Sequence, residues 1–413
     1  MSAEVRRPTV LVTDVGRGSS VAIIRSLAGC GWRVIAGDAS PSSVGFHSRH
    51  VRERFIYPSP TRAPGAFVEA VLDGIARWSV DLVIPVTDAA MLPLSAERER
   101  IPGSCRVAMP DREPLRLAAD KDRTLAIAAD LGIPVPRSQL MDSAEAARQA
   151  AAALGLPLVL KPISSRTYRD RRPVEAFEVS YASRAEDVLD RWHGLQGRVG
   201  ILAQEYCAGE GHGVGLLMHE GRPLAAFQHR RIHEVPLTGG PSSLRESVKL
   251  DPVLYDYSVR LLAALRWTGL AMVEFKVGRE GPKLMEINGR VWGSLPLAVM
   301  SGVDFPRLLG ELYLQGPPAP GVEPQLTYRT GVRARNLGLD LVWIASALGG
   351  RGGRRPFPVP GPAHGVGGLI GLLDPRCRLD LLSLRDPGPA VAELPLILRK
   401  LWTSARAAGL NHS

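Results

Sequence analysis

The fold of this chain is decided by the stretch from Ala271 to Leu295, which reads AMVEFKVGREGPKLMEINGRVWGSL. Apolar and polar residues alternate in 271–277 and again in 283–287, and glycine and proline occupy the connection between these runs. This pattern predicts a β-hairpin. Side chains two apart on a strand point the same way, so Glu286 and Asn288 share one face of the second strand.

The hairpin gathers oxygen ligands suited to a hard cation. Glu274 on the first strand and Glu286 and Asn288 on the second supply two carboxylates and an amide oxygen. Proteins hold Mg²⁺ with one or two carboxylates, and phosphate oxygens and water complete its shell. Arg290 would face the same space with a charge suited to a phosphoryl group. The alternative is a surface hairpin whose glutamates pair with the hairpin's own lysines, Lys276 and Lys283.

The spacing Glu-x₁₁-Glu-x-Asn-x-Arg resembles the metal-binding strands of the ATP-grasp superfamily. That family includes biotin carboxylase, carbamoyl-phosphate synthase and many carboxylate–amine ligases. In it, two acids and an Asn hold the Mg²⁺ ions that bridge the ATP phosphates, and an Arg just after the Asn assists acyl-phosphate chemistry. The resemblance implies Glu274, Glu286 and Asn288 as metal ligands and Arg290 as a catalytic residue. It implies ATP and Mg²⁺ as cofactors, with Mn²⁺ as an alternative metal.

Composition narrows the classes of protein to consider. At 413 residues and 45% apolar content, the chain is long enough for two or three globular domains. Its net charge of +10 is spread along the chain without a nucleic-acid-binding motif, so we expect no nucleic-acid partner. Four scattered cysteines argue against a zinc site and favour a reducing compartment. No apolar run has the length of a signal-peptide core or a membrane span, and we expect a cytoplasmic protein without stable membrane insertion.

The N-terminal segment predicts a doubly wound βαβ domain. Strand-like runs at 9–13 and 33–36 flank a glycine turn and a helical stretch. The turn has Gly16 and Gly18, but Val21 stands where a dinucleotide fingerprint has its third glycine, which disfavours an NAD site. In ATP-grasp proteins a similar domain precedes the ATP site and forms a wall of the substrate pocket, which is the interpretation we prefer.

Thr87 and Asp88 follow the strand-like run 81–86 of the same domain. Ligands of open α/β sheets collect at the carboxyl ends of the strands, so both residues are candidates for substrate contact. The alternative is that they cap the next helix.

Two lysines stand where the family has its ATP lysines. Lys121 lies in a predicted helix, 115–131, followed by the strand-like segment GIPVP. Lys161 ends the apolar strand 156–160, where phosphate would satisfy its charge. The following loop, Ser164–Arg172, lacks the glycines of the biotin carboxylase flap, so its serines and arginines are unassigned alternatives for holding phosphate.

The resemblance also implies an adenine hinge and a charged substrate region. A predicted strand, 199–206, leads into a turn, and by position Glu205, Tyr206 and Cys207 would line the adenine while Glu210 would bind the ribose. Cys207 has no adjacent histidine base in the sequence, which disfavours a nucleophilic role. Further on, His229 and Arg231 precede a Gly/Ser-rich loop and would face the γ-phosphate or a carboxylate, the alternative being solvated charge.

We therefore predict three units. Residues 1–112 form a Rossmann-like domain, residues 113–316 a two-lobed ATP-grasp domain with its lid at roughly 137–205, and residues 317–413 a C-terminal extension. The extension begins with a proline-rich linker and contains a predicted helix at 339–348, a Gly/Arg/Pro-rich loop to about residue 368, and a basic amphipathic helix at 390–408. That last helix would dock on the body, a partner or a membrane surface.

The resemblance implies an ATP-dependent carboxylate–amine ligase that forms an acyl phosphate and joins it to an amine, releasing ADP and phosphate. Lys161, Arg290, His229 and Arg231 would be the catalytic residues. One alternative is a carboxylase or carbamoyl-phosphate-synthase-like enzyme that activates bicarbonate, although no biotin-carrier segment is visible. Another is a non-catalytic ATP sensor. The sequence names neither the carboxylate nor the amine, and a homodimer is left open.

Overall fold

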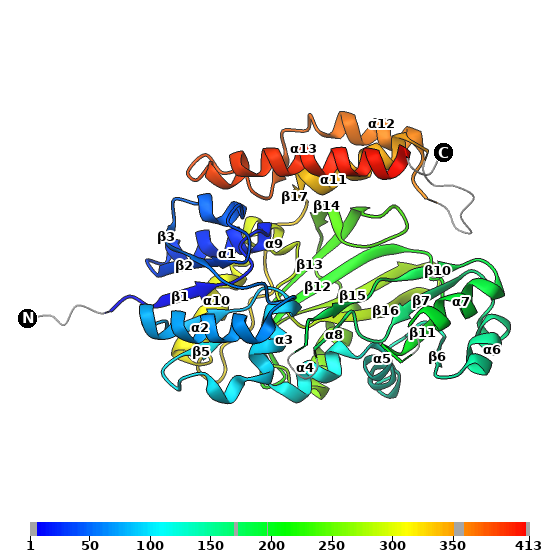
Figure 1. Cartoon of the computed structure of the whole chain (residues 1–413), viewed down its shortest axis with the longest axis horizontal. Coiled ribbons are helices and arrows are strands. Elements are labelled where there is room, and N and C mark those ends of the chain that lie inside the picture. The colour runs from blue at the N-terminus through cyan, green and yellow to red at the C-terminus, as the bar shows by residue number, and fades with distance from the viewer. Residues whose placement is uncertain (1–5, 169–171, 196, 351–358, 410–413) are drawn as a thin grey trace, which may run out of the picture.

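The computed structural model describes residues 6–168, 172–195, 197–350 and 359–409, with backbone alone at residue 400 and from residue 402 on. Three principal sheets organise these residues. Figure 1 shows the N-terminal sheet toward one end of the long central sheet and the second sheet toward the other end, with the C-terminal helices as a layer along one side.

The N-terminal unit is a five-stranded parallel sheet in the order β3-β2-β1-β4-β5. Its strands are β1 (Thr9–Val12), β2 (Arg33–Asp38), β3 (Val51–Ile56), β4 (Leu82–Ile84) and β5 (Arg106–Val107). Its helical segments are α1 (Gly18–Gly29), η1 (Val44–His47), α2 (Pro64–Trp78), α3 (Asp88–Ala96) and η2 (Arg98–Arg100). The strand order reverses between β1 and β4, which confirms the doubly wound fold. In folds of this kind, ligands bind at the carboxyl ends of the strands next to the reversal.

The single helix predicted for 115–131 is wrong, because the chain forms α4 (Arg112–Ala119) and α5 (Lys121–Asp130) instead. Asp120 between them has an extended backbone, and its carboxylate accepts a hydrogen bond of 3.2 Å from the backbone N–H of Arg123. An aspartate in this position caps a new helix better than it continues an old one. The break places Lys121 in the first turn of α5.

The second sheet is antiparallel, with the order β10-β7-β11-β6. It comprises β6 (Ser138–Met141), α6 (Ala144–Leu154), β7 (Leu158–Pro162), β10 (Ser180–Ala182), α7 (Ala185–Leu195) and β11 (Ile201–Glu205). A short ribbon of β8 (Arg166–Thr167) and β9 (Glu175–Ala176) projects beside it. The sheet has its own apolar core, in which Trp192 of α7 packs with Leu160 and Ala203. The predicted lid segment, 137–205, runs through this sheet, and its role as a lid stays a prediction.

The central sheet has seven strands in the order β16-β15-β12-β13-β14-β17-β18. These are β12 (Glu210–His219), β13 (Arg222–Glu234), β14 (Ser242–Ser247), β15 (Gly269–Gly278), β16 (Gly281–Asn288), β17 (Arg333–Arg335) and β18 (Cys377–Leu379). The helices of this part are α8 (Pro252–Ala264), α9 (Leu295–Ser301) and α10 (Phe305–Gln315). The predicted hairpin is confirmed as β15 and β16. Helix α10 packs on α1, β4 and β5, so the N-terminal unit shares a core with this part of the chain.

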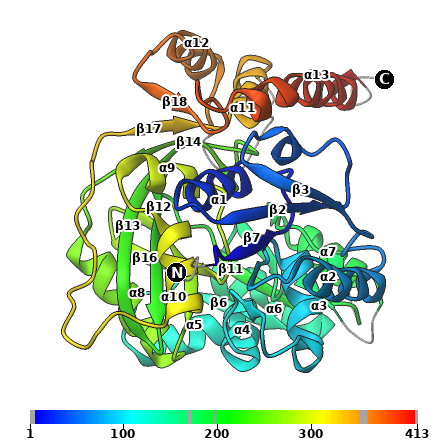
Figure 2. The same cartoon turned by 90° about the vertical axis from the view of Figure 1, so that its left-hand side faces the viewer.

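The C-terminal layer contains α11 (Leu337–Leu348), α12 (Pro362–Gly371) and α13 (Gly388–Gly409) and lies over both the N-terminal unit and β14 and β17 (Figures 1 and 2). The loop predicted through residue 368 is wrong, since α12 forms there. A Cβ at Gly365 would lie 2.7 Å from Leu348 Cγ, so glycine lets α12 pack closely on α11. The glycines that suggest a loop thus serve helix packing.

Helix α13 docks on the body through its first half, where Ala390, Ala392 and Leu396 pack against Val21 and Val44. The side chain of Arg399 is exposed, and those of Lys400 and Arg406 lie outside the described residues. Among the helices of the described residues, none combines the length and the apolar character needed to cross a membrane.

Candidate active site

The β15–β16 hairpin brings the two predicted acids face to face. Glu274 and Glu286 are directly opposite one another in the strand register, and Met272 pairs with Asn288. The side-chain amide of Asn288 donates a hydrogen bond of 2.7 Å to Glu274 Oε1. Cross-strand neighbours on one face are in contact range, so these oxygens form a single polar group.

Arg231 of β13 reaches across the sheet to form an ion pair with Glu274. Strand β12 lies between β13, which carries Arg231, and β15, which carries Glu274. It has glycines at the positions where a larger side chain would clash with the residues of β13. A Cβ at Gly211 would lie 3.0 Å from Arg231 Cδ, and one at Gly213 would lie 2.5 Å from His229 Cε1. The glycines of β12 therefore make room for the cation that neutralises Glu274.

Glu286 faces the two predicted ATP lysines. Lys121 Nζ lies 3.5 Å from Glu286 Oε2 and donates a hydrogen bond of 2.8 Å to Ser165 Oγ. Lys161 lies on β7, and burial lowers the pKa of its ammonium group while the charge of Glu286 raises it. A lysine in the first turn of α5 and one on β7 thus converge on the same carboxylate.

The two carboxylates differ in their protonation behaviour. Burial raises the pKa of Glu274, against the effect of Arg231. Burial also acts to raise the pKa of Glu286, but Lys121 and Lys161 outweigh it and hold that pKa below the usual value.

We name Glu274, Glu286, Arg231, Lys121 and Lys161 the hairpin cluster. Two glutamates and an asparagine are a donor set that fits Mg²⁺. In the described residues, no group of three or more His, Cys, Asp and Glu side chains is placed to hold a metal, and the ligand role of Glu274, Glu286 and Asn288 stays a prediction.

The surface-hairpin alternative is wrong. Lys276 Nζ pairs with Glu234 at 3.0 Å, and Lys283 Nζ pairs with Glu205 at 2.8 Å. Lys283 also pairs with Glu280 of the hairpin turn at 3.2 Å, but among the ion pairs of the described residues Glu274 and Glu286 contact Arg231 and Lys121 rather than these two lysines.

The predicted adenine hinge connects β11 to β12. Glu205 accepts hydrogen bonds from Lys283 Nζ at 2.8 Å and Arg137 Nε at 2.7 Å. Burial opposes its ionisation, yet these two cations lower the pKa of Glu205 to about 2. Tyr206 and Cys207 follow in the connection, and burial raises the pKa of the Cys207 thiol. A weakly acidic thiol of this kind is a poor nucleophile at neutral pH.

Glu210, at the start of β12, has an exposed carboxylate that contacts His212 Nε2 at 2.9 Å and Arg230 Nη1 at 3.1 Å. It lines a cavity of about 450 Å³ that also includes Arg231 and Arg333. The cavity therefore adjoins the hairpin cluster through Arg231. The ribose contact predicted for Glu210 stays a prediction.

His229 lies under the site rather than at its surface. Its side chain is buried, and Nε2 is 3.1 Å from Ser294 Oγ. Burial, assisted by the charges of Arg231 and Arg245, holds the pKa of His229 well below the usual value. The ring is therefore neutral at pH 7. A direct contact between His229 and a substrate stays a prediction.

The carboxyl edge of the N-terminal sheet closes the site on the other side. Arg290 Nε donates a hydrogen bond of 2.8 Å to Asp88 Oδ2. Thr87 Oγ1 accepts from Ala90 N at 3.4 Å as a helix cap, and it also donates to Asp14 Oδ2 at 2.9 Å. The helix-cap interpretation is thus confirmed for Thr87, while substrate contact by Thr87 and Asp88 stays a prediction.

Asp14 and Arg17, which were not among the predicted site residues, follow β1 at the same edge. Asp14 has a positive φ of 55°, an uncommon conformation that often accompanies a functional role. Burial raises the pKa of Asp14, and burial together with Arg290 lowers that of Arg17. Their place after a buried strand at the topological switch point is the signal that could have found them.

A second buried charge cluster, also missed, joins the central sheet to the C-terminal layer. Asp340 of α11 accepts a hydrogen bond of 2.8 Å from Ser243 Oγ, and its Oδ1 atom lies 2.8 Å from His233 Nδ1. Arg335 forms an ion pair of 3.0 Å with Asp340. Arg245 of β14 pairs with Asp380. We name His233, Arg245, Arg335, Asp340 and Asp380 the C-terminal cluster.

These features define a class of protein: two lobes with a lysine- and carboxylate-lined site between them, preceded by a doubly wound domain. A family described as "ATP-grasp in the biosynthetic pathway with Ter operon" matches residues 198–336. Solved structures with the same fold include biotin carboxylase from Campylobacter jejuni, with a TM-score of 0.62, 14% identity, and coverage of 79% of this chain and 74% of that one. The L-amino acid ligase from Bacillus licheniformis has a TM-score of 0.59 at 15% identity and 78% coverage of both chains. Residues 198–336 thus match an ATP-grasp family, and the chain shares its fold with these solved structures.

Curated relatives cover less of the chain. The carbamoyl phosphate synthase large chain of Archaeoglobus fulgidus is 22% identical over 238 residues, which are 54% of this chain and 21% of that protein. The N5-carboxyaminoimidazole ribonucleotide synthase of Pseudomonas aeruginosa is 30% identical over 195 residues, 45% of this chain and 49% of that protein. The chain thus spans less than half the length of either relative.

Proposed function

We propose that this protein is an ATP-dependent ligase that converts a small-molecule carboxylate to an acyl phosphate and joins it to an amine. The observation that carries the proposal is that Glu274 and Glu286 face each other across the hairpin. Asn288 donates a hydrogen bond to Glu274, and Lys121 forms an ion pair with Glu286. This is an arrangement for holding a polyphosphate beside a divalent cation. The relatives named as a ligase and as synthases support the same class of chemistry.

The chain's own residues would act on charge and orientation. Lys121 and Lys161 would bind phosphate oxygens and offset the negative charge that develops in phosphoryl transfer. Glu274, Glu286 and Asn288 would hold Mg²⁺ or Mn²⁺, and when bound the cation supplies further charge neutralisation at the phosphates. The hinge residues Glu205 to Cys207 and the Glu210 carboxylate would bind the nucleoside.

The reaction has two steps. A carboxylate oxygen of the substrate attacks the γ-phosphorus, an O–P bond forms, and the bond to the bridging oxygen breaks to release ADP. An amine then attacks the acyl carbon, a C–N bond forms, and phosphate leaves with the bonding pair. Arg290 and Arg231, which form ion pairs with Asp88 and Glu274, would orient anionic groups at these steps.

The second candidate is activation of bicarbonate, which the names of the carbamoyl phosphate synthase relatives favour. It predicts ADP formation with bicarbonate as the sole carboxylate. Phosphorus NMR with Mg·ATP, first with bicarbonate alone and then with pooled amino acids and small carboxylates, separates the two. ADP and phosphate that appear only with the pool support the ligase. Release of AMP and pyrophosphate would mean adenylation and would contradict the proposal at its centre.

Glu286→Gln tests the site directly. We expect loss of at least about 10³-fold in turnover, because the change removes one of two carboxylates that would hold the metal. Binding of Mn²⁺ in the presence of ADP, followed by electron paramagnetic resonance, should weaken in parallel. The control is Glu280→Gln, since Glu280 lies at the exposed turn of the same hairpin with its side chain 83% exposed. Undiminished turnover in Glu286→Gln would remove the metal-site assignment.

A further inference from the structure

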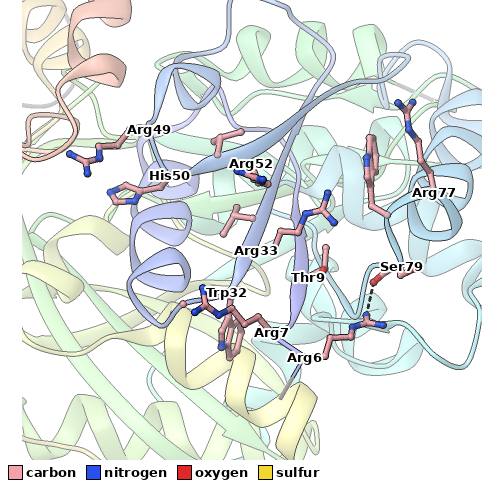
Figure 3. Close-up of a pocket in the computed structure, with 14 residues that line it drawn as sticks. Arg6, Arg7, Thr9, Trp32, Arg33, Arg49, His50, Arg52, Arg77 and Ser79 are labelled. Atoms are coloured by element: carbon pink, nitrogen blue, oxygen red, sulfur yellow. Dashed lines mark hydrogen bonds between the residues drawn. The ribbon is translucent and has the colours of Figure 1, made fainter. Parts of the chain in front are cut away.

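A second cavity lies on the N-terminal unit, away from the hairpin cluster. It has a volume of about 750 Å³ and opens at the amino ends of β1, β2 and β3. Figure 3 shows Arg33 and Arg52 in its middle, Arg6 and Arg7 below, and Arg49 and Arg77 at its two sides. Its basic lining residues are Arg6, Arg7, Arg33, Arg49, His50, Arg52 and Arg77. The lining, which lies wholly within the described residues, includes no aspartate or glutamate.

Neighbouring acids neutralise only part of this charge. Arg6 pairs with Asp81 at 2.7 Å, and Arg33 lies 3.4 Å from Glu53. The Nε atom of Arg33 is buried without a hydrogen-bond partner. Within the described part of the chain, the guanidinium groups of the other four arginines have no carboxylate in ion-pair distance; these are Arg7, Arg49, Arg52 and Arg77. Clustered cations without counter-charges create a positive potential in a concave site.

This cavity and the candidate active site lie at opposite edges of one parallel sheet. Asp14 and Asp88 follow the carboxyl ends of β1 and β4, whereas Thr9 and Arg33 are the first residues of β1 and β2. In open α/β folds the substrate crevice is at the carboxyl edge. The basic cavity is therefore a separate site that the proposed ligase reaction does not use.

We propose that the cavity binds a small ligand that carries two or more phosphate groups. Guanidinium groups match phosphate oxygens in bidentate geometry, and several of them on different elements can hold more than one phosphate. The volume lies in the range of small-molecule sites. The concave shape favours a compact ligand over a nucleic acid, which would follow an extended basic stripe. The indole of Trp32 adds an apolar surface to the lining.

Isothermal titration with inorganic tripolyphosphate, without divalent cations, tests the proposal on the full chain. The candidate active site is first disabled in a Lys121→Met/Lys161→Met background, so that binding reports on the basic cavity. We expect saturable binding with a stoichiometry near one. Arg52→Glu should weaken the affinity by about tenfold or more, and the double change Arg7→Glu/Arg52→Glu should abolish measurable binding.

The matched control is Arg54→Glu. Arg54 is exposed on the same strand as Arg52, two residues away, but does not line the cavity. The same charge reversal at Arg54 should weaken the affinity clearly less than Arg52→Glu does, because Arg54 does not line the cavity and would act on the ligand only through solvent. Unchanged circular dichroism and thermal midpoints confirm that each variant is folded.

Three results would overturn the proposal. One is the absence of binding in the lysine-substituted background. Another is an Arg54→Glu effect equal to that of Arg52→Glu, which would mean non-specific attraction by surface charge. The third is tighter binding of a 20-nucleotide single strand than of tripolyphosphate at equal phosphate concentration, with the same dependence on Arg52, which would assign the surface to nucleic acid. Failure of the ligase reaction has no bearing on these outcomes, since no turnover is measured.

Discussion

The hairpin cluster and the C-terminal cluster are both built from acids and cations on the central sheet, but they differ in exposure. In the hairpin cluster the side chains of Glu286 and Lys121 are 31% and 9% exposed. In the C-terminal cluster those of Arg245 and Asp380 are 1% and 2% exposed, and Asp340 is fully buried. The Glu286 carboxylate of the hairpin cluster is thus partly open to solvent, whereas the Arg245–Asp380 pair and Asp340 of the C-terminal cluster are sealed.

The difference shows how similar residues serve different purposes. A sealed ion pair has already lost its water, so each partner depends on the other, and removing one leaves an uncompensated charge. An open cluster keeps access to solvent and can exchange its internal ion pairs for a phosphate or a metal. We therefore expect substitutions in the C-terminal cluster to reduce stability and substitutions in the hairpin cluster to reduce binding and turnover.

The largest expected effect on stability comes from Asp380→Asn. It should lower the free energy of unfolding by about 3 to 5 kcal/mol, because Arg245 keeps its charge in a buried place. Urea unfolding followed by circular dichroism measures the loss. The control is Asp374→Asn, whose partner Arg376 has a side chain 88% exposed, and there we expect less than about 1 kcal/mol. Equal losses in the two variants would contradict the distinction between sealed and open charge.

Lys121→Met tests the hairpin cluster, where we expect a loss of activity rather than of stability. We expect kcat/KM for ATP to fall by about 10- to 100-fold, since a charged contact to phosphate is lost. The free energy of unfolding should change by less than about 1 kcal/mol, because Met retains the apolar stem and Glu286 keeps Lys161. Steady-state kinetics and urea unfolding together provide the test, with the exposed Lys249→Met as the control. If the variant loses stability but keeps its kcat/KM, Lys121 stabilises the fold and does not bind ATP.

Glu205 lies outside both clusters, and its substitution should reduce stability less than Asp380→Asn does. Its folded-state pKa of about 2 lies below the value of 4.5 expected when unfolded, so its contribution to stability is complete above pH 4.5 and is lost as the pH falls toward 2. Glu205→Gln should cost about 1 to 2 kcal/mol at pH 7, since Arg137 is largely exposed.

The measurement is the unfolding free energy of wild type and Glu205→Gln at several pH values. The difference between them should be constant from pH 7 to 5 and shrink below pH 4.5. A difference that grows as the pH falls would show that Glu205 is not held ionised by Arg137 and Lys283.

The sequence predicted the local parts of the site well. The alternation in 271–287 was enough to pair the strands that carry Glu274 and Glu286, because a hairpin is a local structure. Lys121 and Lys161 were found by resemblance, and the structure brings Lys121 to Glu286. Local pattern did not predict the break at Asp120, where a single side chain starts a new helix.

Contacts between residues far apart in the chain could not be predicted from the sequence. Arg231 reaches Glu274 only because β12 carries glycines between them, and Arg290 meets Asp88 only through the placement of the N-terminal unit. The partners Arg245 and Asp380 are 135 residues apart along the chain. Such pairs depend on the assembled fold, which periodicity and composition do not encode. The domain boundaries, the roles of the site residues and the homodimer stay predictions.

The segment from Asp380 to Asp386 has a consequence for synthesis. Asp380 holds Arg245 of the central sheet, while Asp386 holds Arg25 of α1 with an ion pair of 2.8 Å and accepts a hydrogen bond of 2.8 Å from Ser48. These anchors are translated late. At a translation rate of roughly 5 to 20 residues per second, the N-terminal sheet waits on the order of ten seconds or more for the residues that fasten it. During that interval Arg25 lacks its ion-pair partner and the apolar surface around Val21 and Val44 lacks the residues that cover it, so we expect this surface to be a point of misassembly in the nascent chain.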